Sequence, residues 1–551
     1  MRFFPIDGLR ASRRRGAGAL FVLLAAVAIA AAAHPLIDST PAPDVAADAG
    51  CAADQPCSCT SIMVGAAATT DGSVITSHTC DGNYRTWIDV RPARENGPGA
   101  MNEVVTGRLH NAYPGDRRGV EVRGSIPESP RSHAFINTAY PAMNEHQVGI
   151  GETTWGGRRE LRSENGLFLI EELERLMLER ATTAREAIAI ADSLTAEHGY
   201  IDVGECLTVI DPTEVWQLEI IGPGEGRTGA VWVAARIPDD HVAVSANIPR
   251  IGEVELDDPD RFLASANLYS RAEELGLWDP ASGEPFKFWQ VYGGRDANHA
   301  RREWRVLSLA APSLGLDPEA PELPLSVKAE RKLGPRDVMA MFRDTYEGTP
   351  YDPIGNLVVK DREGVERVSP EATPWMSRSE MALLNALEPG VVPRERTIAV
   401  SRCAYSTVIQ ARGWLPDPIG GIVWFGLDNP ATTARIPLFA GITDVPPSFK
   451  RCDQHGFTTE SAGWAFRRAS RLAEVEWGST RDEVMAVVMA LEDRAFAELP
   501  DVEERALALY DVSPDSARAY LTTYSSDFAR AAEQRYWELG DRFWARFARG
   551  F

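Results

Sequence analysis

The hydrophobic pattern of the chain changes abruptly at Cys59. An apolar run from Ala17 to Ala33 follows a basic opening, and residues 34–58 are then rich in Ala, Asp and Pro without periodicity. After Cys59, short apolar and β-branched runs alternate with turn residues, which is typical of strands. The pattern predicts a leader with no core to bury, followed by an ordered body that begins at Cys59.

The first ordered segments predict an antiparallel hairpin. Two apolar runs, at residues 60–64 and 73–77, flank the pair Asp71-Gly72. An Asp-Gly pair favours the tight turn of a hairpin. Further strands are predicted at residues 87–90, 207–210, 215–220, 230–234, 241–244, 397–410 and 421–427.

Helices are predicted in two parts of the chain. Between residues 164 and 197, Leu and Ile recur at three- and four-residue steps, and Thr182-Thr183 opens the second of two helices. From Ala462 to Phe551 the pattern is helical throughout. Strand blocks flanked by helical blocks favour an α+β fold over a strict alternation of strand and helix.

The first 33 residues have the features of an export signal. Four arginines between residues 10 and 15 precede the apolar run, which ends in small residues at Ala31–Ala33. The alternative is an uncleaved anchor, because the run is close to the length that spans a bilayer. We expect a signal peptide over residues 1–33, a spacer over residues 34–58, and an exported protein that is periplasmic or extracellular.

Charge and cysteine content limit the classes of function. The chain of 551 residues carries a net charge of −22 and has no Lys/Arg run after the leader, so its surface repels phosphate backbones and nucleic acid is not an expected partner. Seven cysteines are too few for a disulfide scaffold. The odd count leaves at least one thiol unpaired, while Cys51 and Cys57 are close enough to form a small disulfide loop.

Few side chains are available for catalysis by the common motifs. The sequence has no zinc-binding His-Glu-x-x-His, no Gly-x-Ser-x-Gly and no phosphate-binding loop. An N-terminal Cys needs no partner, because its thiol attacks while its own α-amine, with an unperturbed pKa of about 7.7, accepts the proton. Cys59 fits this role if the Ser58–Cys59 bond is cut. From the residues alone, a buried or disulfide-bonded Cys59 is the alternative.

Segments from Cys59 almost to the C-terminus carry a family resemblance. They include Cys-Thr-Ser-Ile-Met-Val-Gly at residues 59–65 and Met-Asn-Glu-His-Gln-Val-Gly-Ile-Gly at residues 143–151. The others lie at residues 71–73, 80–81, 204–205, 232–247, 346–352 and 401–410. Together they resemble the Cys-nucleophile dipeptidase A family of the N-terminal nucleophile hydrolases.

The resemblance implies a fold and an activity. The fold is an αββα N-terminal nucleophile hydrolase sandwich over residues 59–551, with a helical C-terminal portion from about residue 460. The activity is hydrolysis of dipeptides through a thioester on Cys59, released from a zymogen by cleavage of the leader. Neither a metal nor an organic cofactor is needed.

Four more residues receive roles from the resemblance. Asp81 would bind the α-amine of the nucleophile, and Asn247 and Asn144 would hold the oxyanion. Arg402 would favour the thiolate and bind a carboxylate. From the residues alone, Asp81 and the two asparagines are also ordinary turn residues, and Arg402 fits a structural salt bridge.

Other candidate residues match the family less well. His78 departs from the pattern, since many relatives carry Arg three residues before the Asp, although a His there can still donate a hydrogen bond. Glu152, Glu205 and Glu219 are candidates for binding a substrate amine, and each also fits an ordinary surface or turn carboxylate.

The expected partners are small peptide substrates, with no nucleic acid and no stable membrane association after maturation; a homo-oligomer is left open. Two other functions fit the same residues. One is hydrolysis of N-acyl amides by the same machinery, because substrate choice lies in pocket loops. The other is a catalytically silent secreted binding protein that keeps its leader, in which the α-amine of Cys59 stays blocked.

Overall fold

The segment that follows Cys59 forms the centre of an antiparallel sheet. The computed structural model describes residues 58–548. Strands β1 (Ser61–Val64) and β2 (Val74–Asp81) form the expected hairpin, in whose turn Ser73 N donates to Asp71 Oδ1. In the described part of the chain, this sheet has seven strands in the order β16 (Ser326–Lys328), β14 (His241–Ser245), β1, β2, β19 (Cys403–Ala411), β20 (Ile422–Leu427) and β21 (Ile436–Phe439).

A second antiparallel sheet packs against the first. Strand β2 contacts strands β10, β11 and β12 of this sheet. Counting only residues 58–548, it has eight strands, in the order β15 (Phe262–Ala264), β13 (Val231–Ile237), β12 (Val215–Ile221), β11 (Gly204–Ile210), β10 (Gly149–Gly156), β9 (Met143–Asn144), β8 (Phe135–Asn137) and β3 (Asp89–Arg91).

The two sheets approach each other closely along β2, the strand that leads to Asp81. Thr76 Oγ1 and Thr208 Oγ1 share a hydrogen bond of 2.6 Å across the interface. Gly151 makes the approach possible, because a Cβ at this position would lie only 2.3 Å from the carbonyl oxygen of Ser77. The next residue along β10 is Glu152, which the close approach brings to the end of β2.

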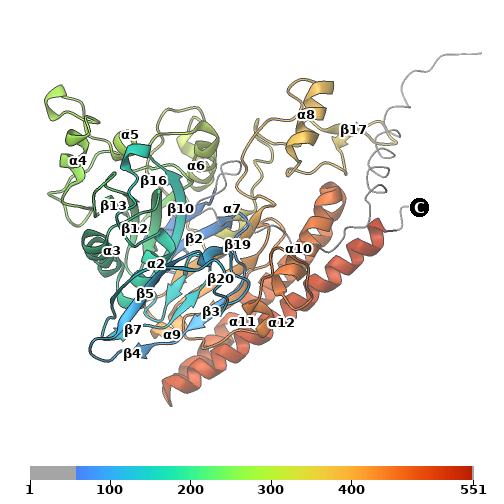
Figure 1. Cartoon of the computed structure of the whole chain (residues 1–551). Helices are drawn as coiled ribbons and strands as arrows, with labels where there is room; N and C mark the ends of the chain where they lie inside the picture. The colour runs from blue at the N-terminus through green and yellow to red at the C-terminus, as the bar shows by residue number, and fades with distance from the viewer. Residues whose placement is uncertain (1–57, 549–551) are drawn as a thin grey trace, which may run out of the picture. The chain divides into compact units, whose positions relative to one another are not determined.

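Helices cover the outer face of each sheet. Helices α2 (Ile170–Arg180) and α3 (Ala184–His198) contact the second sheet, and Thr183 caps α3 by accepting from Glu186 N. Helices α10 (Ala462–Ala473), α11 (Trp477–Tyr510) and α12 (Pro514–Phe547) contact β20 and β21 of the first sheet (Figure 1). The rings of Trp424 and Phe496 stack there with centroids 4.4 Å apart.

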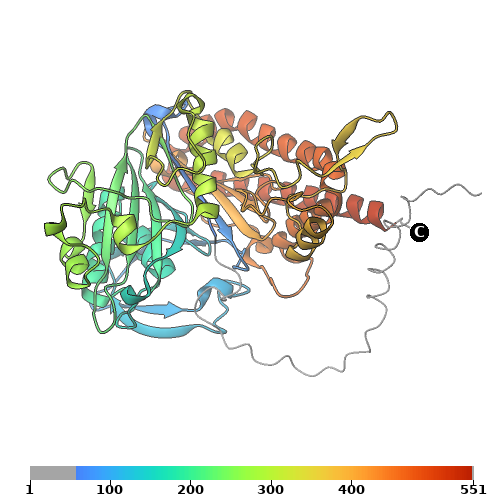
Figure 2. The ribbon, with the colours of Figure 1, turned by 90° about the horizontal axis from the view of Figure 1, so that it is seen from above.

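The remaining elements lie in long connections between the strands. Helix α6 (Ala297–Ala310) packs on β14 and lies among the yellow-green segments of Figure 2. The other α-helices of the described residues are α4 (Leu268–Glu274), α5 (Phe288–Tyr292), α7 (Pro335–Phe342), α8 (Arg378–Leu387) and α9 (Asp417–Gly420). Three small two-stranded sheets pair β4 (Arg94–Glu95) with β7 (Arg131–Ser132), β5 (Met101–Thr106) with β6 (Glu121–Pro127), and β17 (Val358–Lys360) with β18 (Glu366–Val368) within the described residues.

Mixed helices and antiparallel sheets confirm the predicted α+β class. The helices expected between residues 164 and 197 and beyond Ala462 are present. The strand predicted at residues 397–410 is wrong in its first part, because β19 begins only at Cys403. Ile398 and Ala399 are fully buried in a loop, so their apolar character reflects burial rather than sheet pairing.

The predictions for the leader fall outside the described residues. These are the signal peptide, the spacer up to residue 57 and the Cys51–Cys57 disulfide loop; only Ser58 of the leader is described. From residue 58 to residue 548, every helix lacks either the length or the apolar character needed to cross a membrane.

Candidate active site

Cys59 lies where the first hairpin ends. Thr60 N donates to Thr79 Oγ1 over 2.9 Å, and Thr79 N donates to Thr60 O over 3.0 Å. Because the strands are antiparallel, this register places Cys59 beside the end of β2, where Asp81 is the last residue. The thiol is free, and Cys59 is only 1% exposed. The hairpin therefore brings a buried thiol to a buried carboxylate.

A histidine and a second carboxylate also lie near the thiol. One ligand-type atom each from Cys59, His78 and Glu152 all lie within 4.8 Å of one another. His78 Nδ1 is 2.8 Å from Glu152 O, and His78 Nε2 is buried without a hydrogen-bond partner among the described residues. Burial lowers the pKa of His78 to about 4, so this ring is neutral near pH 7 and supplies no positive charge to a thiolate.

The thiol is protonated in this environment. Burial raises the pKa of Cys59 well above its usual value, and the nearby Glu152 raises it further. The backbone N–H of Asp81, which hydrogen-bonds to the sulfur, acts in the opposite direction and is the weaker effect. A nucleophilic Cys59 therefore needs a base that removes its proton during attack.

Two buried carboxyl groups, those of Glu152 and Glu205, lie side by side. Burial raises the pKa of Glu152 to about 7, and burial followed by repulsion from Glu152 raises the pKa of Glu205. Thr154 Oγ1 donates to Glu152 Oε1 over 3.1 Å. The Oε2 atoms of both glutamates are buried and have no hydrogen-bond partner in the described structure. Such a pair retains a proton near neutral pH or accepts a cation.

Asp81 has one oxygen occupied and one open. Its Oδ2 accepts from Arg396 Nη2 and, over 3.2 Å, from Thr79 Oγ1. Its Oδ1 is buried and has no hydrogen-bond partner within residues 58–548. A buried carboxylate oxygen without a donor is costly, so Oδ1 is an acceptor for a donor that is generated later, such as a free amine at Cys59.

Two arginines hold Ser58, the residue that precedes Cys59. Arg402 Nη2 donates to Ser58 Oγ over 2.7 Å, and Arg396 Nε donates to the same oxygen over 3.1 Å. Arg396 Nη2 also donates to the Ser58 carbonyl oxygen. Arg396 therefore links the Ser58–Cys59 peptide bond to Asp81.

A third arginine fixes Cys59 from the other side. Arg302, on α6, is fully buried, and its Nη1 donates to Cys59 O over 2.6 Å and to Thr60 Oγ1 over 2.9 Å. Its Nη2 donates to Ala246 O and to Asn247 Oδ1, each over 2.9 Å. Arg302 thus joins the nucleophile strand to the end of β14.

Asn247 adopts a left-handed conformation directly after β14, with φ of 62°. Asn tolerates this region better than most residues. Its Nδ2 donates to Thr154 O over 2.7 Å, which uses one of its two amide hydrogens. The second amide hydrogen is available for an oxyanion.

The side-chain amide of Asn144 is engaged in hydrogen bonds to the surrounding backbone. Its Nδ2 donates to Leu178 O and Ala181 O, each over 2.8 Å, so both amide hydrogens are used. Its Oδ1 accepts from Val148 N over 3.1 Å. Glu219 is similarly engaged, because its Oε1 accepts from Arg250 N over 2.6 Å.

Arg302 and Arg396 are the residues that sequence reasoning missed. Neither lies in a motif, and they are separated from Cys59 by more than two hundred residues of sequence. His78 and Glu152 were visible only as weak candidates. One signal in the sequence pointed to Arg302. It and Glu303 are charged residues on α6 that stand next to apolar positions.

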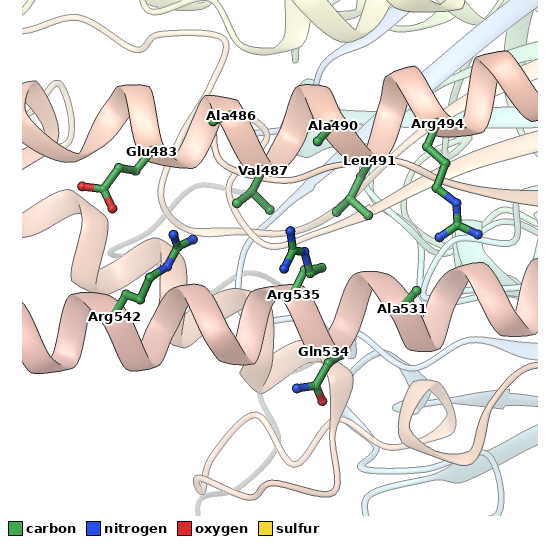
Figure 3. A pocket seen from close by; sticks show the side chains of 10 residues that line it. All are labelled: Glu483, Ala486, Val487, Ala490, Leu491, Arg494, Ala531, Gln534, Arg535 and Arg542. Carbon is green, nitrogen blue, oxygen red and sulfur yellow. The ribbon is translucent and has the colours of Figure 1, made fainter.

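A groove elsewhere on the surface does not include the candidate site. It has a volume of about 590 Å³ and lies between α11 and α12, where Val487 and Leu491 point from α11 toward α12 (Figure 3). None of the residues that line it surrounds Cys59. The groove therefore contributes nothing to the chemistry of the thiol.

Comparison with known proteins identifies relatives over most of the chain. A sequence model described as peptidase family C69 matches residues 58–489. The match begins one residue before Cys59 and includes Asp81, Asn247, Arg302 and Arg402.

Individual relatives support the same grouping. A "Probable dipeptidase" of Latilactobacillus sakei is 25% identical over 457 residues, which is 79% of this chain and 85% of the relative. A "Probable dipeptidase" of Salmonella dublin is 25% identical, covering 76% of this chain and 90% of the relative. A "Probable dipeptidase B" of Lactococcus lactis is 24% identical, covering 88% and 94%.

Proposed function

Because the chain belongs to peptidase family C69, we propose that it is a dipeptidase whose nucleophile is the thiol of an N-terminal Cys59. The chain is a cysteine-type peptidase by its family. The names of its relatives support dipeptides as substrates. The observation that carries the proposal for Cys59 is the unpartnered, buried Oδ1 of Asp81 beside it.

Cleavage of the Ser58–Cys59 bond creates the base in this proposal. The new α-amine of Cys59 donates to Asp81 Oδ1, which keeps the amine oriented toward Sγ. Its unperturbed pKa of about 7.7 suits proton transfer at neutral pH. The proposal needs no imidazole as base, in accordance with the neutral, low-pKa ring of His78.

The reaction then proceeds in two steps. Cys59 Sγ attacks the carbonyl carbon of the dipeptide while the α-amine takes the thiol proton. The second amide hydrogen of Asn247 stabilises the oxyanion. The C–N bond breaks as the leaving amine takes the proton from the α-amine, which leaves a thioester. Water attacks the thioester, giving its proton to the α-amine, and the thiol leaves with a proton.

The two charged ends of a dipeptide find complementary groups around Cys59. Arg402 and Arg396 lose Ser58 as a hydrogen-bond partner when it is removed, and these cations suit a substrate carboxylate. Glu152, beside the thiol, suits the free amine of the substrate. This arrangement favours dipeptides over N-acyl amides, which lack the amine. The two antiparallel sheets packed between helical layers support an N-terminal nucleophile hydrolase sandwich as the fold.

We further propose that the mature protein acts after export, in the periplasm or outside the cell. The basic and apolar opening of the sequence supports this location. The uncleaved chain is then a zymogen, because its Cys59 nitrogen is an amide and cannot act as a base.

The mature N-terminus is the test of the proposal. Intact-mass measurement of protein exported by its native host is expected to give a chain that begins at Cys59. The same sample is expected to hydrolyse free dipeptides faster than their N-acetylated forms. Active protein that still carries Ser58 contradicts the α-amine as base, and a preference for N-acyl amides contradicts the dipeptidase assignment.

A further inference from the structure

A second cluster of ligand-type side chains lies where the turn between β9 and β10 meets the connection between β7 and β8. His133, Glu145 and His146 each offer one atom, and these three atoms lie within 4.8 Å of one another. The cluster shares no residue with the Cys59 site. Its side chains remain partly accessible, since those of His133 and His146 are 12% and 32% exposed.

The spacing of the two imidazoles suits a tetrahedral metal ion. His146 Nε2 lies 3.1 Å from His133 Nδ1. Two Zn–N bonds of about 2.05 Å that end on these nitrogens subtend an angle of about 98° at the metal, within the range of a distorted tetrahedral site. Glu145 Oε1 lies 4.0 Å from His133 Nδ1, so a shift of less than about 1 Å brings the carboxylate to the usual ligand spacing.

Neighbouring groups hold His146 ready for this role. Asp417 Oδ2 lies 3.5 Å from His146 Nδ1, and Gln147 Nε2 fixes the same carboxylate by donating to Asp417 Oδ1 over 3.0 Å. A proton on Nδ1 that faces Asp417 leaves Nε2 with its lone pair toward His133. A carboxylate behind a histidine is the common support of a metal-bound imidazole.

The other two ligands are also positioned. Glu145 Oε1 accepts from Ala134 N over 3.0 Å, and Glu145 Oε2 accepts from Arg518 Nη2 over 2.7 Å. Moving the proton of His133 from Nδ1 to Nε2 frees Nδ1 without a change in net charge.

We propose that His133 Nδ1, His146 Nε2 and the carboxylate of Glu145 bind one Zn²⁺, with water in the fourth position. Two imidazoles and one carboxylate suit Zn²⁺ better than Mg²⁺ or Ca²⁺, which prefer oxygen ligands. Through Asp417 and Arg518 the ion connects the β9–β10 turn to helices α9 and α12. Its role is to stabilise the fold rather than to take part in the reaction at Cys59.

Zinc binding to the full chain tests the proposal. After chelator treatment and dialysis, equilibrium dialysis with ZnCl₂ is expected to show one Zn²⁺ per chain in the wild type and in Cys59→Ala. The double variant His133→Asn/His146→Asn is expected to bind none at this site. His198→Asn is the matched control and retains binding, since His198 also has a carboxylate neighbour but no second histidine.

The Cys59→Ala variant separates the proposal from its rival. The other described group with suitable spacing is Cys59, His78 and Glu152. Loss of the ion in Cys59→Ala, or its retention in the double histidine variant, overturns the proposal. Co²⁺ gives a second readout, because a thiolate ligand adds a charge-transfer band that nitrogen and oxygen ligands do not.

A milder variant covers the case in which the double variant does not fold. Asp417→Asn keeps all three ligands and removes only the support of His146. Zn²⁺ affinity is expected to fall by about 10- to 100-fold, and the rise in Tm that Zn²⁺ causes in the wild type is expected to shrink. An unchanged affinity in a folded Asp417→Asn contradicts the site.

Discussion

Arginines hold both sides of the Ser58–Cys59 bond, and the two sides differ in what they bind. Arg302 contacts atoms that belong to the proposed mature protein: the carbonyl of Cys59, Thr60 and Asn247. Arg396 and Arg402 contact Ser58, the residue that cleavage removes. One side is therefore a permanent framework, whereas the other must exchange its partners on maturation.

The difference shows how one site can serve two states of the same chain. On the framework side, the hydrogen bonds place the nucleophile strand and Asn247 before cleavage occurs. On the exchanging side, cleavage gives the buried Asp81 Oδ1 a new donor, the α-amine of Cys59. The same cleavage removes Ser58 as a partner of Arg396 and Arg402. Substitutions on the framework side are expected to affect folding and activity together, and those on the exchanging side to affect activity alone.

The largest expected effect is that of Cys59→Ala, which removes the atom that both sides position. Activity on dipeptides is expected to fall by at least about 10⁴-fold, because no other described group replaces the nucleophile. Tm is expected to change little, since one small side chain is lost. Hydrolysis assays and thermal unfolding check the two parts, and a fully active variant would falsify the mechanism. Cys59→Ser is expected to keep a trace of activity.

Arg302→Met tests the framework side. It leaves the buried carbonyls of Cys59 and Ala246 without donors, and the free energy of unfolding is expected to fall by about 3 kcal/mol or more. Denaturant unfolding measures the loss. Arg435→Met is the matched control, since Arg435 is also fully buried and donates to two carbonyls.

The control separates a loss of stability from a loss of the placement of Cys59. Arg435→Met is expected to lose stability while its folded fraction keeps full activity, whereas Arg302→Met loses both. If the folded fraction of Arg302→Met turns over at the wild-type rate, Arg302 has no role in placing Cys59.

Asp81→Asn tests the exchanging side. An amide cannot accept the proposed α-ammonium as a carboxylate does, so kcat is expected to fall about 100-fold, as for loss of a positioned acid–base group. KM and Tm are expected to stay close to the wild-type values. Steady-state kinetics of the variant with its mature N-terminus measures the split. A raised KM with unchanged kcat would assign Asp81 to substrate binding instead.

Glu152→Gln has the smallest expected effect and depends on pH. The pKa of Glu152 is raised by burial to about 7, so its carboxylate form, which binds the substrate amine, increases as the pH rises through about 7. KM of the wild type for dipeptides is expected to decrease over that rise. In the variant KM is expected to be about tenfold higher and independent of pH, as for loss of a charged hydrogen bond.

The stability of Glu152→Gln provides a second measurement. The folded protein binds more protons than the unfolded chain between pH of about 4.3, the ordinary pKa of Glu, and about 7. The contribution of Glu152 to the free energy of unfolding therefore falls as the pH rises through this window. The variant is expected to gain stability relative to the wild type over the same window.

Glu219→Gln is the control for the kinetic measurement. Burial also raises the pKa of Glu219 to about 7, but its carboxylate braces the backbone of Arg250. The control is expected to leave the pH dependence of KM unchanged. A Glu219→Gln variant with the same kinetic change would show that Glu152 acts through the general charge of the interior and not through the substrate.

Local pattern predicted the parts of the site that lie close together in sequence. The hairpin that leads from Cys59 follows from one turn motif and two apolar runs, since hairpin register depends on residues that are neighbours along the chain. The roles expected for Asp81 and Asn247 came from the family resemblance and not from the pattern. The strand predicted over residues 397–402 failed because apolar residues are buried in loops as well as in sheets.

What the sequence by itself determined is the α+β class, the hairpin that carries Cys59 and Asp81, and the family. What only the tertiary structure decided is which distant side chains complete the site. Arg302 and Arg396 reach Ser58 and Cys59 from connections far along the chain, and Gly151 brings Glu152 and His78 close to the thiol. Burial then sets the charge states, because the cost of a charge in the interior depends on the whole surrounding fold rather than on neighbouring residues in the sequence.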